Sequence, residues 1–125
     1  MNKLFLSLLA LLCSITIFAQ TDLIISEYVE GWSNNKAIEV YNPTSASINL
    51  KNYRLTRYSN GSDVPPASSN WYVVLPDVEL KPFRTYVCVI DKRDPNGVDQ
   101  EAPVWEQLAD RADVFLCPDY DVSKA

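Results

Sequence analysis

Short runs of alternating apolar and polar residues, each ended by a turn-forming cluster, fill most of the chain after residue 22. Alternation with a period of two is typical of β-strands, whereas an amphipathic helix needs apolar residues three or four positions apart. The sequence therefore predicts an all-β domain. The expected strands lie at 23–29, 36–42, 47–50, 53–59, 71–76, 78–82 leading into 84–91, and 112–117, with one or two helical turns at 104–111.

The connections between these runs favour antiparallel pairing. Asn42-Pro43 ends one run, and a long loop follows that contains Asn60-Gly61 and Pro65-Pro66. Parallel strands would need crossover helices, and no convincing helix longer than two turns is present. We therefore expect an antiparallel β-sandwich or barrel.

The first 19 residues have the pattern of a secretory signal peptide. Lys3 precedes an apolar run at 4–18, and the small residue Ala19 follows. We expect cleavage between Ala19 and Gln20, which leaves one domain at 20–125. The apolar run is shorter than the ~20 residues of a membrane-spanning helix. The predicted location is therefore extracellular or periplasmic, without a membrane span.

Cys13 offers an alternative, because an acylated cysteine would make the chain a surface lipoprotein. Bulky Leu12 stands just before it, where a lipoprotein signal prefers a small residue. Acylation would also leave an apolar start to the mature chain, at 14–20. We therefore favour secretion over lipidation.

The chain is acidic, with 16 Asp and Glu residues against 11 Lys and Arg residues and a formal net charge of −5. Nine of the acidic residues lie at 91–121. A phosphate backbone is bound by clustered basic residues, so we expect no nucleic-acid partner. The acidic part is best interpreted as a solvated surface.

Few residues suited to catalysis are present. The chain contains no His, which removes the commonest general base and most zinc ligand sets, and its three Gly residues form no phosphate-binding loop. Glu27 and Glu39 lie on strands that we expect to be neighbours, and two carboxyl groups can act on a glycosidic bond. We favour a structural role for both, with Leu23, Ile25 and Val29 on the same strand face as Glu27.

The loop DKRDPNGVDQE at 91–101 is the candidate calcium site, because carboxylate and amide oxygens are the ligands that calcium prefers. Lys92, Arg93 and Pro95 interrupt the spacing of a helix–loop–helix calcium site. We therefore expect a solvated loop and no cofactor, with calcium as the alternative. The candidate ligands are Asp91, Asp94, Asn96, Asp99 and Glu101, with Asp119 and Asp121 near the end of the chain.

Three aromatic residues beside loops form the candidate binding surface, namely Trp32, Tyr58 and Trp71. An exposed Trp next to Asn and Ser suits a glycan or protein ligand. The alternative is that each ring closes an open end of the core.

Cys88 and Cys117 remain after the leader is removed. In an oxidising compartment an even pair suggests a disulfide, provided that the strands at 84–91 and 112–117 are neighbours. The alternative is two separate buried thiols.

The segment at 22–55 resembles a lamin tail domain. The features shared with that family come in order: LIISEY, a strand with an internal Glu; VEGWSNNK, a polar loop; IEVYNPT, an Asn-Pro segment; and LKNYRL, a Leu-x-x-Tyr-x-Leu step. VELKPFRTYVCVID is similar to the family's Leu-x-Pro-Gly step before a central strand, but Phe83 stands in place of Gly. The resemblance covers 22–91.

This resemblance implies an immunoglobulin-like antiparallel β-sandwich without catalytic residues. In bacteria such domains are secreted or surface-linked and often accompany nuclease or other hydrolase domains, and the leader resembles those of Bacteroidetes. We therefore expect a non-enzymatic binding or adhesion module for a protein or glycan ligand. The alternative is an accessory domain in front of an exported hydrolase. The ending CPDYDVSKA follows a strand without a closing element, which suggests a truncated product or a fragment.

Overall fold

The computed structural model describes residues 20–58, 61–64 and 72–116. The predicted signal peptide at 1–19, with Cys13, lies outside this part of the chain. Trp71, Cys117, Asp119 and Asp121 also lie outside it.

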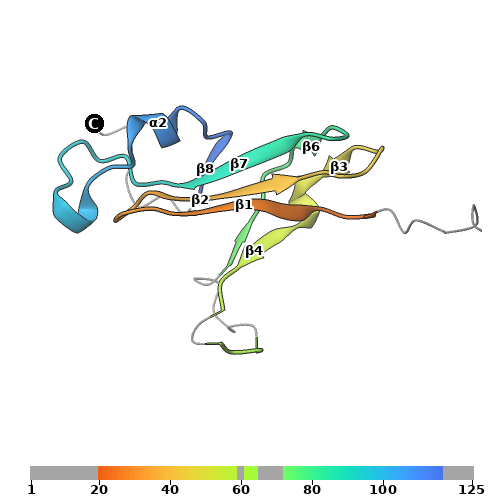
Figure 1. Cartoon of the computed structure of the whole chain (residues 1–125), viewed down its shortest axis with the longest axis horizontal. Coiled ribbons are helices and arrows are strands. Elements are labelled where there is room, and N and C mark those ends of the chain that lie inside the picture. Colours follow the sequence, from red (N-terminus) through yellow and green to blue (C-terminus); the bar gives the residue numbers. More distant parts are fainter. Residues whose placement is uncertain (1–19, 59–60, 65–71, 117–125) are drawn as a thin grey trace, which may run out of the picture.

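The described residues form eight short strands, as Figure 1 shows. Each strand lies within or beside a run of alternating residues, so the predicted strands are confirmed. In chain order the strands are β1 (Ile24–Glu30), β2 (Lys36–Tyr41), β3 (Ile48–Asn49), β4 (Arg54–Thr56), β5 (Tyr72–Val74), β6 (Glu79–Leu80), β7 (Thr85–Ile90) and β8 (Val114–Leu116). Three short helices lie between them, namely η1 (Leu50–Asn52), η3 (Asp99–Glu101) and α2 (Glu106–Ala109).

The strands make a four-stranded sheet in the order β1-β2-β7-β8 and two two-stranded sheets, β3-β6 and β4-β5. All pairs are antiparallel except β7 with β8, which is parallel and sets Cys88 opposite Val114. The expectation of antiparallel strands throughout was wrong here. The chain from 91 to 113 crosses over the sheet with two short helices, η3 and α2, so no long helix is needed for the crossover.

The main core lies between the four-stranded sheet and the smaller sheets. Val40 of β2 and Cys88 of β7 pack there against three leucines of the opposite layer, and all five residues are buried. The leucines are Leu50, Leu75 and Leu80. This arrangement of two layers around one core is the β-sandwich that the sequence predicts.

A second cluster covers the other face of the same sheet. Ala37 and Val89 are buried there against Val104, and Leu108 and Ala109 of α2 pack beside them. In Figure 1, α2 lies on one side of the sheet and β4 on the other. The two central strands are therefore buried on both faces, so the alternating pattern of β2 has apolar residues on each side.

A bulge changes the pattern of β1. Ile25 pairs with Val40, but Glu27 pairs with Glu39, the next residue of β2. The register with β2 therefore shifts by one residue between Ile25 and Glu27. The prediction that Leu23, Ile25 and Val29 share one face was wrong. Leu23 packs on the main core and Val29 on the second cluster, while Ile25 is exposed. One extra residue in a strand turns the side chains that follow it to the opposite face of the sheet.

Asn42, the Asn of the Asn-Pro step, fastens the two layers together and is fully buried. Its Nδ2 donates to the carbonyl oxygens of Ala46 at 2.8 Å and Leu80 at 3.0 Å. Its Oδ1 accepts from the N–H of Thr44 at 2.9 Å. The donor and acceptor groups of this buried amide are thus all hydrogen-bonded. Because another arrangement of the surrounding backbone would leave some of them unpaired, the amide favours this one arrangement.

Phe83 keeps the backbone geometry of the Gly that it replaces. Its φ is +57°, in the left-handed region, directly after Pro82. Its N–H donates to the carbonyl of Asn42 at 2.9 Å. A positive φ after Pro is the pattern of a type II turn, which normally carries Gly at this position. The turn before β7 is therefore formed in spite of the substitution.

Candidate binding surface

The loop between β1 and β2 closes tightly on itself. The N–H of Gly31 donates to the carbonyl of Asn35 at 2.8 Å, and Asn35 Nδ2 donates to the carbonyl of Trp32 at 2.8 Å. A Cβ at position 31 would lie 2.7 Å from the Asn35 carbonyl oxygen, so the loop requires Gly there. The closure buries Asn35 and leaves Trp32 exposed.

The second loop runs from β7 to α2 and contains η3. Val104 donates its N–H to the carbonyl of Lys92 at 2.8 Å, which brings the two ends of the loop together. Lys92 Nζ lies 2.9 Å from Glu101 Oε2 across it. These contacts give the loop a defined shape.

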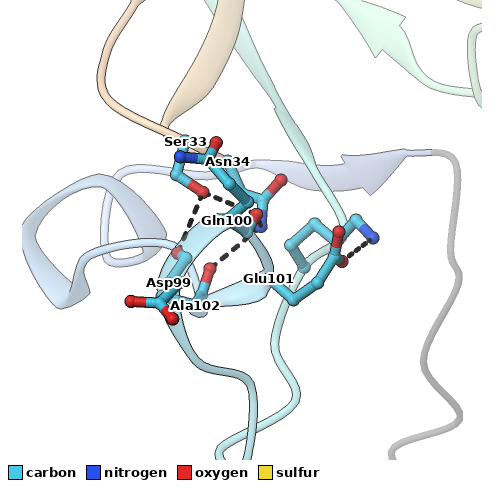
Figure 2. A network of polar contacts seen from close by, with 7 residues as sticks. Ser33, Asn34, Asp99, Gln100, Glu101 and Ala102 are labelled. Carbon is cyan, nitrogen blue, oxygen red and sulfur yellow. Dashed lines mark hydrogen bonds and ion pairs between the residues drawn. The ribbon is translucent and has the colours of Figure 1, made fainter.

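The two loops are joined by polar contacts, as Figure 2 shows. Ser33 Oγ donates to the carbonyl of Gln100 at 2.7 Å. Asn34 Nδ2 lies 3.0 Å from the carbonyl oxygens of both Gln100 and Ala102. Each of these bonds runs from a side chain of the first loop to a carbonyl of the second. The loops therefore form one surface rather than two separate ones.

Asn35 makes the deepest contact between the loops. Its Oδ1 accepts from the N–H of Trp105 at 2.8 Å, while its Nδ2 holds the carbonyl of Trp32. One buried side chain thus fixes the backbone at both tryptophans. Their side chains are 54% and 57% exposed, respectively, so two large apolar groups are presented to solvent from this end of the sandwich. We call Trp32, Trp105 and the two segments that carry them, 30–36 and 91–106, the two-tryptophan surface.

The structure places the predicted surface residues differently from the sequence prediction. Trp32 belongs to the two-tryptophan surface. Tyr58 is exposed just after β4, and no contact in the described part of the chain joins it to Trp32. Trp71 lies outside the described residues. Trp105 was missed because it was included in the expected helical stretch at 104–111, whereas α2 begins one residue after it.

The two-tryptophan surface is acidic. Residues 30–36 and 91–106 contain six acidic and three basic residues, a formal net charge of −3. Each basic residue already forms an ion pair: Lys36 with Glu30, Lys92 with Glu101, and Arg93 with Asp91. The excess negative charge therefore falls on Asp94, Asp99 and Glu106.

Three of the candidate calcium ligands, Asp91, Asp94 and Glu101, bind other groups of the protein. Asp91 is buried and receives two bonds from Arg93, from Nε at 2.6 Å and from Nη2 at 3.1 Å, and this hydrogen bonding raises the pKa of Arg93. Asp94 Oδ1 accepts from the N–H of Asn96 at 2.9 Å and so forms a local turn. Among the residues that the structure describes, no group of three or more His, Cys, Asp or Glu side chains is placed to hold a metal ion.

Glu27 and Glu39 lie on neighbouring strands, as predicted, and directly opposite each other. Both line a small cavity of about 110 Å³ together with Leu108 and Arg111. Glu39 Oε1 accepts from Ser26 Oγ at 2.6 Å. Two like charges opposite each other in a sheet repel, and Arg111 brings a cation to the same cavity. The structural role that we favour for the pair stays a prediction.

Cys88 is a buried free thiol that faces Val114 of β8. Burial, with a smaller effect from the carboxylate of Asp113, raises the pKa of this thiol to about 11. The structure thus gives no support to the disulfide with Cys117. That pairing stays a prediction, because Cys117 lies outside the described residues.

In the part of the chain that the structure describes, no helix has the length and apolar character needed to cross a membrane.

These features define an immunoglobulin-like β-sandwich domain with a loop surface at one end. The family model described as Lamin Tail Domain matches residues 17–119, and the chain therefore belongs to that family. The resemblance at 22–91 is confirmed, and the match continues through the acidic remainder and β8. Neither a curated protein nor a solved structure matches the chain.

Proposed function

We propose that this lamin tail domain is an exported, non-catalytic binding module. Its ligand would be held at the two-tryptophan surface. The observation that carries the proposal is the pair of bonds by which buried Asn35 fixes the backbones of Trp32 and Trp105. Large aromatic side chains on a pre-ordered backbone are the groups that most often dominate a binding interface.

The charge of the surface indicates the chemistry of the ligand. Its excess carboxylates attract cations, and exposed indole rings bind Lys and Arg groups through cation–π contacts. A protein ligand with basic residues next to apolar ones therefore fits better than a neutral glycan. This preference selects between the two ligand classes that the sequence leaves open.

Paired arrays test this proposal. The purified protein is applied to a peptide array that contains basic, acidic and neutral sequences of equal length, and to a glycan array. We expect binding to basic peptides that contain apolar residues, and we expect this binding to weaken as salt is raised because the charges are screened. Binding that is confined to neutral glycans would contradict the ligand class. Turnover of an array substrate by the protein alone would contradict the non-catalytic role.

A further inference from the structure

The outer edge of β1 is open. β1 lies at one side of the four-stranded sheet and pairs with β2, as Figure 1 shows. Within the described part of the chain, no strand pairs with its other edge. Six of its seven residues are exposed, and only Val29 is half-buried. An edge strand carries unpaired backbone N–H and C=O groups along its outer side, so an extended chain can pair with it.

The opposite edge of the sheet is less suited to such pairing. β8 has three residues, whereas β1 has seven. β1 also exposes three large apolar side chains, Ile24, Ile25 and Tyr28, of which the last two are at least 60% exposed. An added strand would remove part of this apolar area from water, because side chains that are neighbours on paired strands contact each other.

The charged side chains of β1 indicate the charge of a partner strand. Both are acidic, Glu27 and Glu30. Glu30 is already paired with Lys36. The carboxylate of Glu27 makes no hydrogen bond or ion pair with the residues that the structure describes, and Glu39 lies directly opposite it on β2. Glu27 is therefore the acidic residue of this edge that is best placed to meet a partner's cation.

The surroundings of Glu27 also suit one cationic side chain. The cavity of about 110 Å³ that Glu27 shares with Glu39 is lined on its apolar side by Val29 and Leu108, among others. Two carboxylates and the one guanidinium of Arg111 leave it a formal charge of −1. Because ligand pockets span ~300–1,000 Å³, a cavity of this size fits one side chain of a larger ligand better than a whole small molecule.

The charge of β1 argues against a second copy of the chain as the partner. Two β1 strands paired around Glu27 would set this carboxylate against its counterpart, and in any register both strands would bring acidic charges alone. Like charges opposite each other in a sheet repel. Carboxylates on an edge strand thus oppose self-association and favour a strand of opposite charge.

We propose that β1 binds an extended peptide segment, which adds to the four-stranded sheet as a further strand with a Lys opposite Glu27. The peptide runs antiparallel to β1, since this orientation is slightly the more stable one. Backbone hydrogen bonds supply affinity, and the Lys beside Glu27 supplies selectivity. The proposal gives Glu27 a binding role in place of the structural one favoured from the sequence. The site adjoins the two-tryptophan surface at Glu30 but depends on neither tryptophan.

The capped peptide Thr-Val-Thr-Lys-Thr-Val-Thr tests the site, with the backbone amide NMR signals of the protein as the readout. It carries one cation and no aromatic residue. We expect saturable shifts of the amides at 24–30 and none of those at 72–74. Shifts that are absent from 24–30, or that are confined to 114–116, would overturn the proposal. Dimerisation of the protein through β1 without peptide would likewise overturn it.

Two N-methylated forms of this peptide test whether it binds as a strand. One carries N-methyl groups at the odd positions and the other at the even positions, so each loses the donors of one edge, because successive N–H groups of a strand point to opposite sides. The form that keeps the edge facing β1 should bind, and the other should bind at least about tenfold more weakly. Equal binding by the two forms would overturn strand addition.

A charge exchange tests the role of Glu27. Glu27→Lys should weaken binding of the Lys peptide by about fivefold, and it should bind a peptide with Glu in place of Lys more tightly than the original protein does. Asp63→Lys makes the same change at an exposed loop residue and should leave binding unchanged. Circular dichroism confirms that both variants are folded. Equal effects of the two substitutions would overturn the pairing with Glu27.

The double variant Trp32→Ala/Trp105→Ala separates this site from the two-tryptophan surface. It should bind the Lys peptide as the original protein does, whether or not the two tryptophans bind a ligand of their own. Loss of Lys-peptide binding in this variant would place the peptide at the two-tryptophan surface and would overturn the assignment to β1.

Discussion

Asn35 Oδ1 accepts a hydrogen bond of 2.8 Å from the N–H of Trp105, although the two residues lie 70 positions apart in the sequence. The same buried amide holds the carbonyl of Trp32. We expect Asn35→Ala to lower the free energy of unfolding by about 2 kcal/mol, because the part-buried N–H of Trp105 loses its partner and the Trp32 carbonyl keeps only the backbone N–H of Asn35. Urea denaturation followed by fluorescence measures the change.

Two further variants test whether the lost hydrogen bonds cause the loss of stability in Asn35→Ala. Asn35→Asp keeps an acceptor for Trp105 but loses the donor to Trp32, so it should be destabilised as well. Asn96→Ala changes an exposed asparagine in the second loop and should be nearly neutral. A loss in Asn96→Ala as large as that in Asn35→Ala would show that Asn35 has no special role in joining the loops.

Asn42→Ala should destabilise the fold more strongly, by about 3 kcal/mol, since it leaves several backbone groups around a fully buried site without partners. Asn42→Asp retains the acceptor for Thr44 but loses the donors, and it should not restore stability. Chemical denaturation measures both variants, with exposed Asn52→Ala as the control. A free energy of unfolding within about 0.5 kcal/mol of the original value for Asn42→Ala would contradict the role given to the Asn-Pro step.

Phe83→Gly should stabilise the protein by up to about 1 kcal/mol, since a left-handed φ is costly for any residue with a Cβ. The Phe83 side chain is 60% exposed, so its removal sacrifices little burial. Phe83→Ala removes nearly the same side chain and keeps the Cβ, and it should bring no gain. The midpoint of thermal unfolding compares the two variants, and a gain for Ala equal to that for Gly would exclude relief of backbone strain.

The buried Cys88 thiol should make the fold sensitive to alkali. Its pKa rises from 9.0 to about 11 on folding, so between these pH values the unfolded chain loses a proton that the folded chain keeps. Stability from this group is complete below pH 9 and falls as pH rises toward 11, by up to about 1.4 kcal/mol per pH unit. The measurement is the pH dependence of urea unfolding in the presence of reductant. Cys88→Ala should reduce the slope of the free energy of unfolding against pH between pH 9 and 11. Equal slopes for the original protein and the variant would contradict a buried free thiol at position 88.

The strands could be predicted from the sequence because period-two alternation follows directly from a half-buried sheet. The Asn-Pro step could be predicted to end β2, because Pro lacks the N–H that pairing requires, but the bond from Asn42 to Leu80, far away in the sequence, could not. The parallel β7-β8 pair could not be predicted, because the connection at 91–113 crosses the sheet with only one helical turn. The change of face between Leu23 and Val29 was missed because nothing in the sequence marks the bulge in β1.

The candidate surface was predicted only in part. Trp32 stands in a polar loop, which is a visible signal of exposure. Trp105 stands directly before a short helix and is exposed, and Asn35, far away in the sequence, holds its backbone. A contact between distant loops leaves no periodic signal in either of them, so sequence patterns alone could not pair the two tryptophans.

In the function that we propose, Trp32 and Trp105 act together as the recognition surface. The most direct test compares peptide-array binding by the original protein with that of the double variant Trp32→Ala/Trp105→Ala, with Tyr58→Ala as an exposed aromatic control. We expect the double variant to lose array binding and Tyr58→Ala to retain it, with both variants folded by circular dichroism. Unchanged binding by the double variant, or loss of binding in Tyr58→Ala alone, would contradict the account.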